Sequence, residues 1–98
     1  MSMREEITAY CRRWGKTATY EAFWLAHTTC ECCGNHSAAP HHIRTRGAGG
    51  DDDPRNLLAL CTTHHTEIHQ VGSAEFCGRY PVVAHKVEAA LDRPRVMA

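Results

Sequence analysis

Cysteine and histidine side chains gather in one stretch of the sequence, between Cys30 and His69. Cys30 and Cys33 form a Cys-x2-Cys pair, and Cys61 and His64 form a Cys-x2-His pair. Thiolate and imidazole are the ligands of tetrahedral structural zinc sites, with bonds of about 2.3 Å to sulfur and about 2.0–2.1 Å to nitrogen. The spacing therefore predicts one structural Zn²⁺ held by these two pairs.

Cys32 leaves an alternative within the first pair. A pair made of Cys30 and Cys32 is one residue closer than the usual spacing, so Cys30 with Cys33 is the preferred assignment. Gly34 supports that choice, because glycine permits the tight turn that directs both thiolates toward one ion.

A second group has the composition of a catalytic metal centre: His41, His42, Asn56, His65 and His69. On a helix, His65 and His69 share one face, whereas His64 is turned by about 100° from His65, toward the structural zinc. Successive side chains of a strand point to opposite sides, so one of His41 and His42 can bind metal while the other faces a water molecule. Metal-assisted hydrolysis needs that separation of base and ion.

Helical and strand-like segments must position these residues. Apolar periodicity predicts helices over residues 4–14 and 19–27, and breaker residues predict a loop over 47–54. The sequence further predicts a short strand near 41–45, a buried strand over 57–60, a helix from a Thr62 or Thr63 cap to about Val71, and a last helix over about 82–91. The order indicates a small α+β domain.

The 98 residues are enough for one domain, residues 1–98, with a core small enough to need a metal or disulfides. Six cysteines are present, and no apolar secretory segment is seen. No apolar run approaches the roughly 18 residues that cross a bilayer. These features predict a cytoplasmic protein without membrane contact, in which clustered cysteines bind metal rather than form disulfides.

The formal net charge is zero, with 11 basic and 11 acidic residues. Net charge governs long-range steering, whereas contact with a phosphate depends on the local charges. Arg44, Arg46 and Arg55 lie within the motif region and are the candidates for binding phosphate. The acidic run over residues 51–53 opposes them, so we expect modest, salt-sensitive affinity for nucleic acid.

The order His41-His42-Ile43, then Asn56 before an apolar strand, then His65 resembles the HNH endonucleases, also called ββα-metal or His-Me finger nucleases. The two ligand pairs resemble those of the zinc-bearing members. The resemblance covers residues 30–72, under half of the chain. It implies a ββα-metal core with a structural zinc, flanked here by N-terminal helices within residues 4–27 and by the C-terminal helix.

The resemblance also assigns roles to individual residues. His42 matches the general base that deprotonates the attacking water, and Asn56 matches the residue that organises the loop and orients His42 through its side chain or backbone carbonyl. His41 and His65 match the ligands of a catalytic divalent ion, and His69 matches the additional histidine of the colicin-type nucleases. An all-histidine site departs from most members and favours Zn, Ni, Co or Mn over Mg.

The activity that the resemblance implies is hydrolysis of phosphodiester bonds in DNA, giving 5′ phosphate and 3′ hydroxyl ends. Without a recognisable base-reading module, we expect a nicking or weakly specific enzyme, of the kind carried by phages and mobile elements. Two alternatives remain open. One is a noncatalytic zinc module that binds nucleic acid or protein, and the other is an RNA-directed or toxin-type nuclease with the same site.

Overall fold

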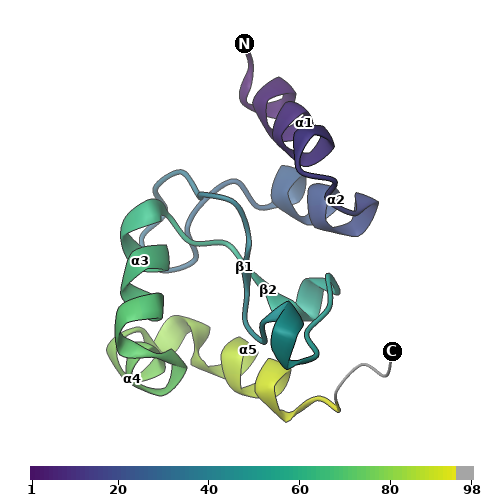
Figure 1. Cartoon of the computed structure of the whole chain (residues 1–98). Helices are drawn as coiled ribbons and strands as arrows, with labels where there is room; N and C mark the ends of the chain where they lie inside the picture. The colour runs from purple at the N-terminus through teal and green to yellow at the C-terminus, as the bar shows by residue number, and fades with distance from the viewer. Residues whose placement is uncertain (95–98) are drawn as a thin grey trace.

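The chain begins with two helices, passes through a long loop into a two-stranded sheet, and ends in three helices (Figure 1). The structure, a computed structural model, describes residues 1–94. In this range the elements are α1 (Met3–Arg13), α2 (Ala18–Ala26), β1 (His41–His42), the 3₁₀ helices η1 (Arg46–Ala48) and η2 (Pro54–Asn56), β2 (Leu57–Leu58), α3 (Thr62–Val71), α4 (Ser73–Arg79) and α5 (Pro81–Asp92). This is the α+β composition that the sequence predicts.

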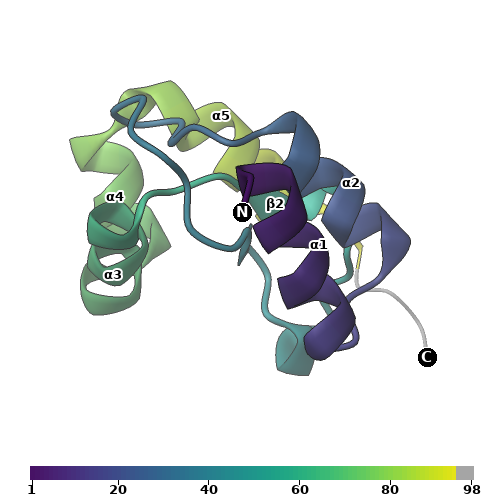
Figure 2. The ribbon, with the colours of Figure 1, turned by 90° about the horizontal axis from the view of Figure 1, so that it is seen from above.

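Strands β1 and β2 pair antiparallel, with His41 opposite Leu58 and His42 opposite Leu57. Alternation along β2 divides the interior into two parts, because successive side chains point to opposite sides. Leu57 packs with α1 and α2, whereas Leu58 packs with the core formed by α3, α4 and α5. Figures 1 and 2 accordingly show the first two helices on one side of the strands and α3 and α4 on the other.

Both strands are shorter than the predicted segments 41–45 and 57–60. After β1 the chain turns into η1, whose N-cap Thr45 accepts a hydrogen bond from the Ala48 N–H. After β2 the backbone pairs with the cysteine-bearing loop instead of with β1. The carbonyl of Ala59 accepts from the Glu31 N–H at 2.8 Å, which ties the end of β2 to that loop.

The N-cap of helix α3 lies before both predicted cap residues. Thr62 is its first helical residue, and Cys61 is the N-cap, with no side-chain capping bond. The predicted cap at Thr62 or Thr63 is therefore wrong. The prediction that α3 ends before Gly72 is confirmed, because Gly72 has a φ of 85°, in the left-handed region that glycine adopts without strain.

Helix α4 is absent from the sequence prediction. It is only seven residues long and follows Gly72 directly, so its apolar periodicity is too brief to be recognised. Phe76 anchors it in the core with no exposed surface. Among residues 1–94, none of the helices has the length and apolar character required to cross a membrane.

Candidate metal centres

Four candidate ligands meet beside the N-terminus of α3: Cys30, Cys33, Cys61 and His64, whose ligand atoms all lie within 4.8 Å of one another. Cys33 Sγ lies 3.8 Å from Cys61 Sγ, and Cys30 Sγ lies 3.6 Å from His64 Nδ1. Zinc bonds of about 2.3 Å to sulfur and about 2.0–2.1 Å to nitrogen, at tetrahedral angles, place such atoms about 3.8 and 3.6 Å apart. This group, called the clamp below, therefore fits a zinc ion.

The backbone around Cys30 favours the thiolate form that binds metal. Gly34 has a φ of 79°, and its N–H donates to the Cys30 carbonyl at 2.9 Å, which closes a tight turn around the first pair of cysteines. Burial opposes ionisation of Cys30. Backbone hydrogen bonds, including one from the Cys32 N–H, outweigh that effect and lower the pKa of the Cys30 thiol to about 7.

Cys32 lies outside the clamp and packs against the hydrophobic core. Burial and the neighbouring Cys30 raise the pKa of the Cys32 thiol to about 12, so it stays protonated at neutral pH. The structure therefore favours the pair of Cys30 and Cys33. All six cysteines are free thiols in the structure.

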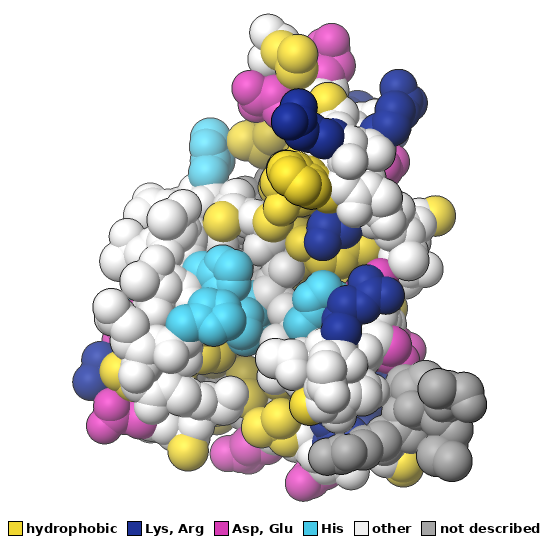
Figure 3. All heavy atoms as spheres, in the orientation of Figure 1, with side chains coloured by type: hydrophobic (Ala, Val, Ile, Leu, Met, Phe, Trp, Pro, Cys, Tyr) yellow, Lys and Arg dark blue, Asp and Glu magenta, His cyan; other side chains and the backbone are white. Residues whose placement is uncertain are grey.

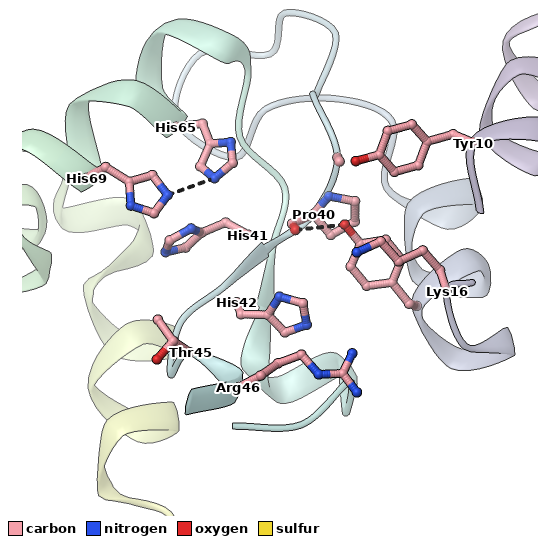
Figure 4. A pocket seen from close by; sticks show the side chains of 11 residues that line it. Tyr10, Lys16, Pro40, His41, His42, Thr45, Arg46, His65 and His69 are labelled. Carbon is pink, nitrogen blue, oxygen red and sulfur yellow. Dashed lines mark hydrogen bonds between the residues drawn. The ribbon is translucent and has the colours of Figure 1, made fainter. Parts of the chain in front are cut away.

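Three imidazoles form a second group, called the histidine site below: His41 on β1, and His65 and His69 on α3 (Figure 4). His65 Nε2 and His69 Nε2 are 3.1 Å apart, and the ring centre of His41 lies 5.1 and 5.0 Å from theirs. Two nitrogen ligands about 2.0–2.1 Å from one tetrahedral ion are about 3.4 Å apart. The histidine site is thus spaced to hold a divalent ion.

Burial favours the neutral form of two of these imidazoles, His41 and His65. His41 is 7% exposed, and burial together with the neighbouring imidazoles lowers its pKa to about 3. Burial and the nearby His69 also lower the pKa of His65. Neutral imidazole is the form that binds metal, so His41 and His65 are ready to act as ligands at pH values where an exposed histidine is protonated.

His42 follows His41 on β1 and turns to the other side of the strand, as alternation predicts (Figure 4). Its ring stacks on Tyr20, with centres 5.6 Å apart and planes inclined by 21°. Its Nε2 lies 2.6 Å from Asp52 Oδ1. A nitrogen base is therefore held beside the histidine site without belonging to it.

A pocket of about 270 Å³ joins His42 to the histidine site. Figure 3 shows histidine side chains around a hollow on this face, with basic side chains on one side of it. Two basic residues line the pocket, Lys16 from the turn between α1 and α2 and Arg46 from η1, and Tyr10 of α1 also lines it. The pocket thus combines the histidine site, a separate imidazole and two cationic side chains.

Asn56 is buried and organises the loop that follows β1. Its side chain accepts from the Arg44 N–H at 2.8 Å and donates to the carbonyls of Arg44 and Asp51, at 3.0 and 2.8 Å. Among residues 1–94, Asn56 has no hydrogen bond to His42. The contact with His42 that is expected from Asn56 is made instead by the Asp52 carboxylate. Asp52 directly follows Asp51, whose carbonyl accepts a hydrogen bond from the Asn56 side chain.

The three predicted phosphate-binding arginines separate in the fold. Arg46 lines the pocket, with a side chain 62% exposed and 3.7 Å from Asp52. Arg44 instead donates to the Leu91 carbonyl, and Arg55 forms an ion pair with Asp53 outside the pocket. Of the three, Arg46 alone is placed to meet a ligand bound beside the histidines.

Three residues of the pocket region are not among the predicted site residues: Asp52, Lys16 and Tyr20. The sequence places Asp52 in an acidic run that opposes phosphate, whereas in the structure its side chain faces His42. Lys16 and Tyr20 belong to the N-terminal helical region, outside the motif over residues 30–72. Because they are distant from the motif in the sequence, no local pattern predicts that they lie beside the histidines.

Comparison with known proteins adds little about activity. The chain is 36% identical over 61 residues to a protein of Escherichia coli strain K12 named "Uncharacterized protein YdfU". The match covers 59% of this chain but only 17% of YdfU. No protein-family model matches the chain, and no solved structure is significantly similar.

Proposed function

We propose that this protein is a metal-dependent endonuclease of the HNH type, which hydrolyses phosphodiester bonds in DNA. One observation carries the proposal: His42 and the histidine site open into the same pocket from opposite sides of β1. The order β1, β2, α3 supports a ββα-metal core. A noncatalytic zinc module would need the clamp alone and leaves this second arrangement without a role.

In the proposed reaction His42 takes a proton from the water that attacks phosphorus, because its ring is at the pocket and outside the ligand group. Lys16 and Arg46 hold the phosphate by charge. A divalent ion at the histidine site would supply stabilisation of negative charge on the phosphate and on the leaving oxygen. The clamp holds the loop, β2 and α3 in register, so that these side chains stay in place.

Incubation with supercoiled plasmid across Zn²⁺, Ni²⁺, Co²⁺, Mn²⁺ and Mg²⁺ tests the proposal. Conversion to the nicked or linear form with at least one of the ions is expected, and the His42→Ala variant should remain inactive with each of them. A parallel incubation with structured RNA distinguishes the RNA-directed alternative. Intact DNA and RNA with every ion, despite a loaded histidine site, would favour the noncatalytic module.

Binding of the ion should release few protons. Because the pKa of His41 is lowered to about 3 and that of His65 is also lowered, His41 is already neutral at pH 6 and His65 less protonated than an exposed imidazole. We expect fewer than about two protons released per ion at pH 6, where three exposed histidines of reference pKa about 6.5 would release more. Calorimetry of the zinc-clamped protein in buffers of different ionisation enthalpy gives this number. A release above about two protons per ion, as three exposed histidines would give, would contradict the burial-based assignment.

Removing a pocket cation should weaken DNA binding more than turnover. Lys16→Ala and Arg46→Ala are each expected to raise KM by about fivefold, since one partly exposed ionic contact contributes up to about 1 kcal/mol. The slope of log affinity against log salt should fall by about one for each phosphate that the variant no longer neutralises. Arg4→Ala, an exposed residue of α1 outside the pocket, is the control. Equal effects of all three variants would indicate only a loss of general charge.

A further inference from the structure

A partly buried chain of hydrogen bonds holds His42 on the side of its Nε2 atom. Its Nε2 lies 2.6 Å from Oδ1 of Asp52, whose side chain is 8% exposed. The Thr17 hydroxyl donates to the other carboxylate oxygen of Asp52 at 2.7 Å. Thr17 is the N-cap of α2, and its hydroxyl also accepts from the Tyr20 N–H at 3.1 Å. The carboxylate is thus fixed through both of its oxygens.

The charge of Asp52 decides which nitrogen of His42 carries the proton. Burial opposes ionisation of Asp52, but its hydrogen bonds with His42 and Thr17 and the charge of Arg46 outweigh it, so the pKa of the carboxyl is lowered. An ionised carboxylate accepts hydrogen bonds and cannot donate one. In neutral His42 the hydrogen therefore lies on Nε2, and the lone pair lies on Nδ1.

Stacking on Tyr20 restrains the ring of His42 in its plane. The Tyr20 hydroxyl is itself anchored, because it donates to the Pro40 carbonyl at 3.1 Å. The orientation of the ring is therefore set by Tyr20, and the position of its proton by Asp52. Tyr20 belongs to α2, and Asp52 belongs to the loop that follows β1.

We propose that Asp52, itself oriented by Thr17, is a positioning residue that holds His42 as the Nε2–H tautomer, so that Nδ1 is the atom that accepts the proton. The inference rests on the proposed function for its catalytic part. The proton of the attacking water passes to Nδ1, the hydroxide oxygen forms the bond to phosphorus, and the leaving oxygen departs with its electron pair. The imidazolium keeps donating Nε2–H to Asp52, whose negative charge stabilises it.

The tautomer of His42 can be observed without any activity measurement. Two-bond ¹H–¹⁵N correlation spectra of the zinc-loaded protein, at a pH where imidazole is neutral, assign the protonated ring nitrogen. The wild-type protein should show Nε2–H. Asp52→Asn should shift the population toward Nδ1–H, because an amide can donate to Nε2. Asp53→Asn, in the same loop but paired with Arg55, is the control and should leave the spectrum unchanged.

Kinetics then separate positioning from simple stability. Asp52→Asn should lower kcat by about a hundredfold or more with little change in KM, as expected when the base is held in the wrong tautomer. Thr17→Val should give a smaller loss in the same direction, and Asp52→Glu should partly restore kcat because it retains the charge. Circular dichroism and melting of each variant verify that the fold is retained.

The outcomes distinguish this inference from the proposed function. A wild-type His42 that carries its proton on Nδ1, or a tautomer unchanged by Asp52→Asn, overturns the inference even if the protein cuts DNA. An Asp52-dependent Nε2–H tautomer in a protein that cuts no nucleic acid supports the positioning contact and overturns the nuclease proposal. Loss of kcat in Asp52→Asn without a change of tautomer also overturns the inference.

Discussion

Cys61→Ser is expected to yield a largely unfolded protein that no longer holds a full equivalent of zinc. Cys61 is the N-cap of α3 and lies 3.1 Å, through its Sγ, from His64 Nδ1 and 3.8 Å from Cys33 Sγ. Removing it separates the cysteine-bearing loop from the junction between β2 and α3. Structural zinc in small domains has an apparent binding free energy of about 10–16 kcal/mol, comparable to or above the roughly 5–15 kcal/mol of a domain's net stability.

Metal analysis and circular dichroism of the purified variant measure this effect. Cys33→Ser should behave in the same way, because it removes a ligand from the opposite side of the clamp. Cys77→Ser is the matched control, since Cys77 is a half-buried cysteine of α4 outside the clamp. Wild-type protein that contains no zinc and melts at the same temperature after chelation would contradict the assignment of the clamp.

His42→Ala should abolish cleavage while the histidine site keeps its ion. His42 belongs to the pocket but not to the ligand group, so its removal deletes a base and no ligand. General base catalysis contributes typically about 10²–10⁴-fold, and a loss in that range is expected in kcat. Affinity for the second ion should stay within about fivefold of the wild-type value.

His65→Ala, unlike His42→Ala, should lose affinity for the ion of the histidine site. The Nε2 atom of His65 is 3.1 Å from that of His69 within the histidine site. Removal of the His65 ring should therefore lower the affinity of this site for its ion by about a hundredfold or more. Loss of an outer-shell partner alone costs about 10–100-fold. Calorimetric titration of both variants, with His85→Ala of α5 as an exposed control, measures the difference. If His42→Ala loses the ion and His65→Ala keeps it, the two roles are reversed.

Local spacing was enough to predict the ligands within each pair, whereas the meeting of pairs distant in the sequence was expected from zinc chemistry and the family resemblance. The Cys-x2-Cys and Cys-x2-His pairs and the four-residue interval from His65 to His69 fix relative positions within one turn of chain, so tertiary context alters them little. The α+β composition followed from similarly local patterns. By contrast, the strand lengths were overestimated, because the backbone after Leu58 pairs with the cysteine-bearing loop and not with β1.

The surroundings of His42 could not be predicted from local pattern. Thr17 meets Asp52 across 35 residues of sequence, and Lys16 reaches the pocket only because α1 and α2 pack against β2 through Leu57. An acidic residue in a loop has many possible partners, and no periodicity selects His42 among them. These contacts depend on how the N-terminal helices pack, which is decided by the whole core.

Helix α3 carries ligands of both metal groups on consecutive residues, His64 and His65. An ion that fixes the rotation of α3 through His64 also fixes where His65 and His69 point. By reciprocity, occupancy of either group must strengthen the other to the same degree. Because the clamp offers four ligands and the histidine site three, we expect the clamp to fill first and the histidine site second. Under metal scarcity the protein would then lose the proposed activity while still folded, and regain it on resupply without having to refold.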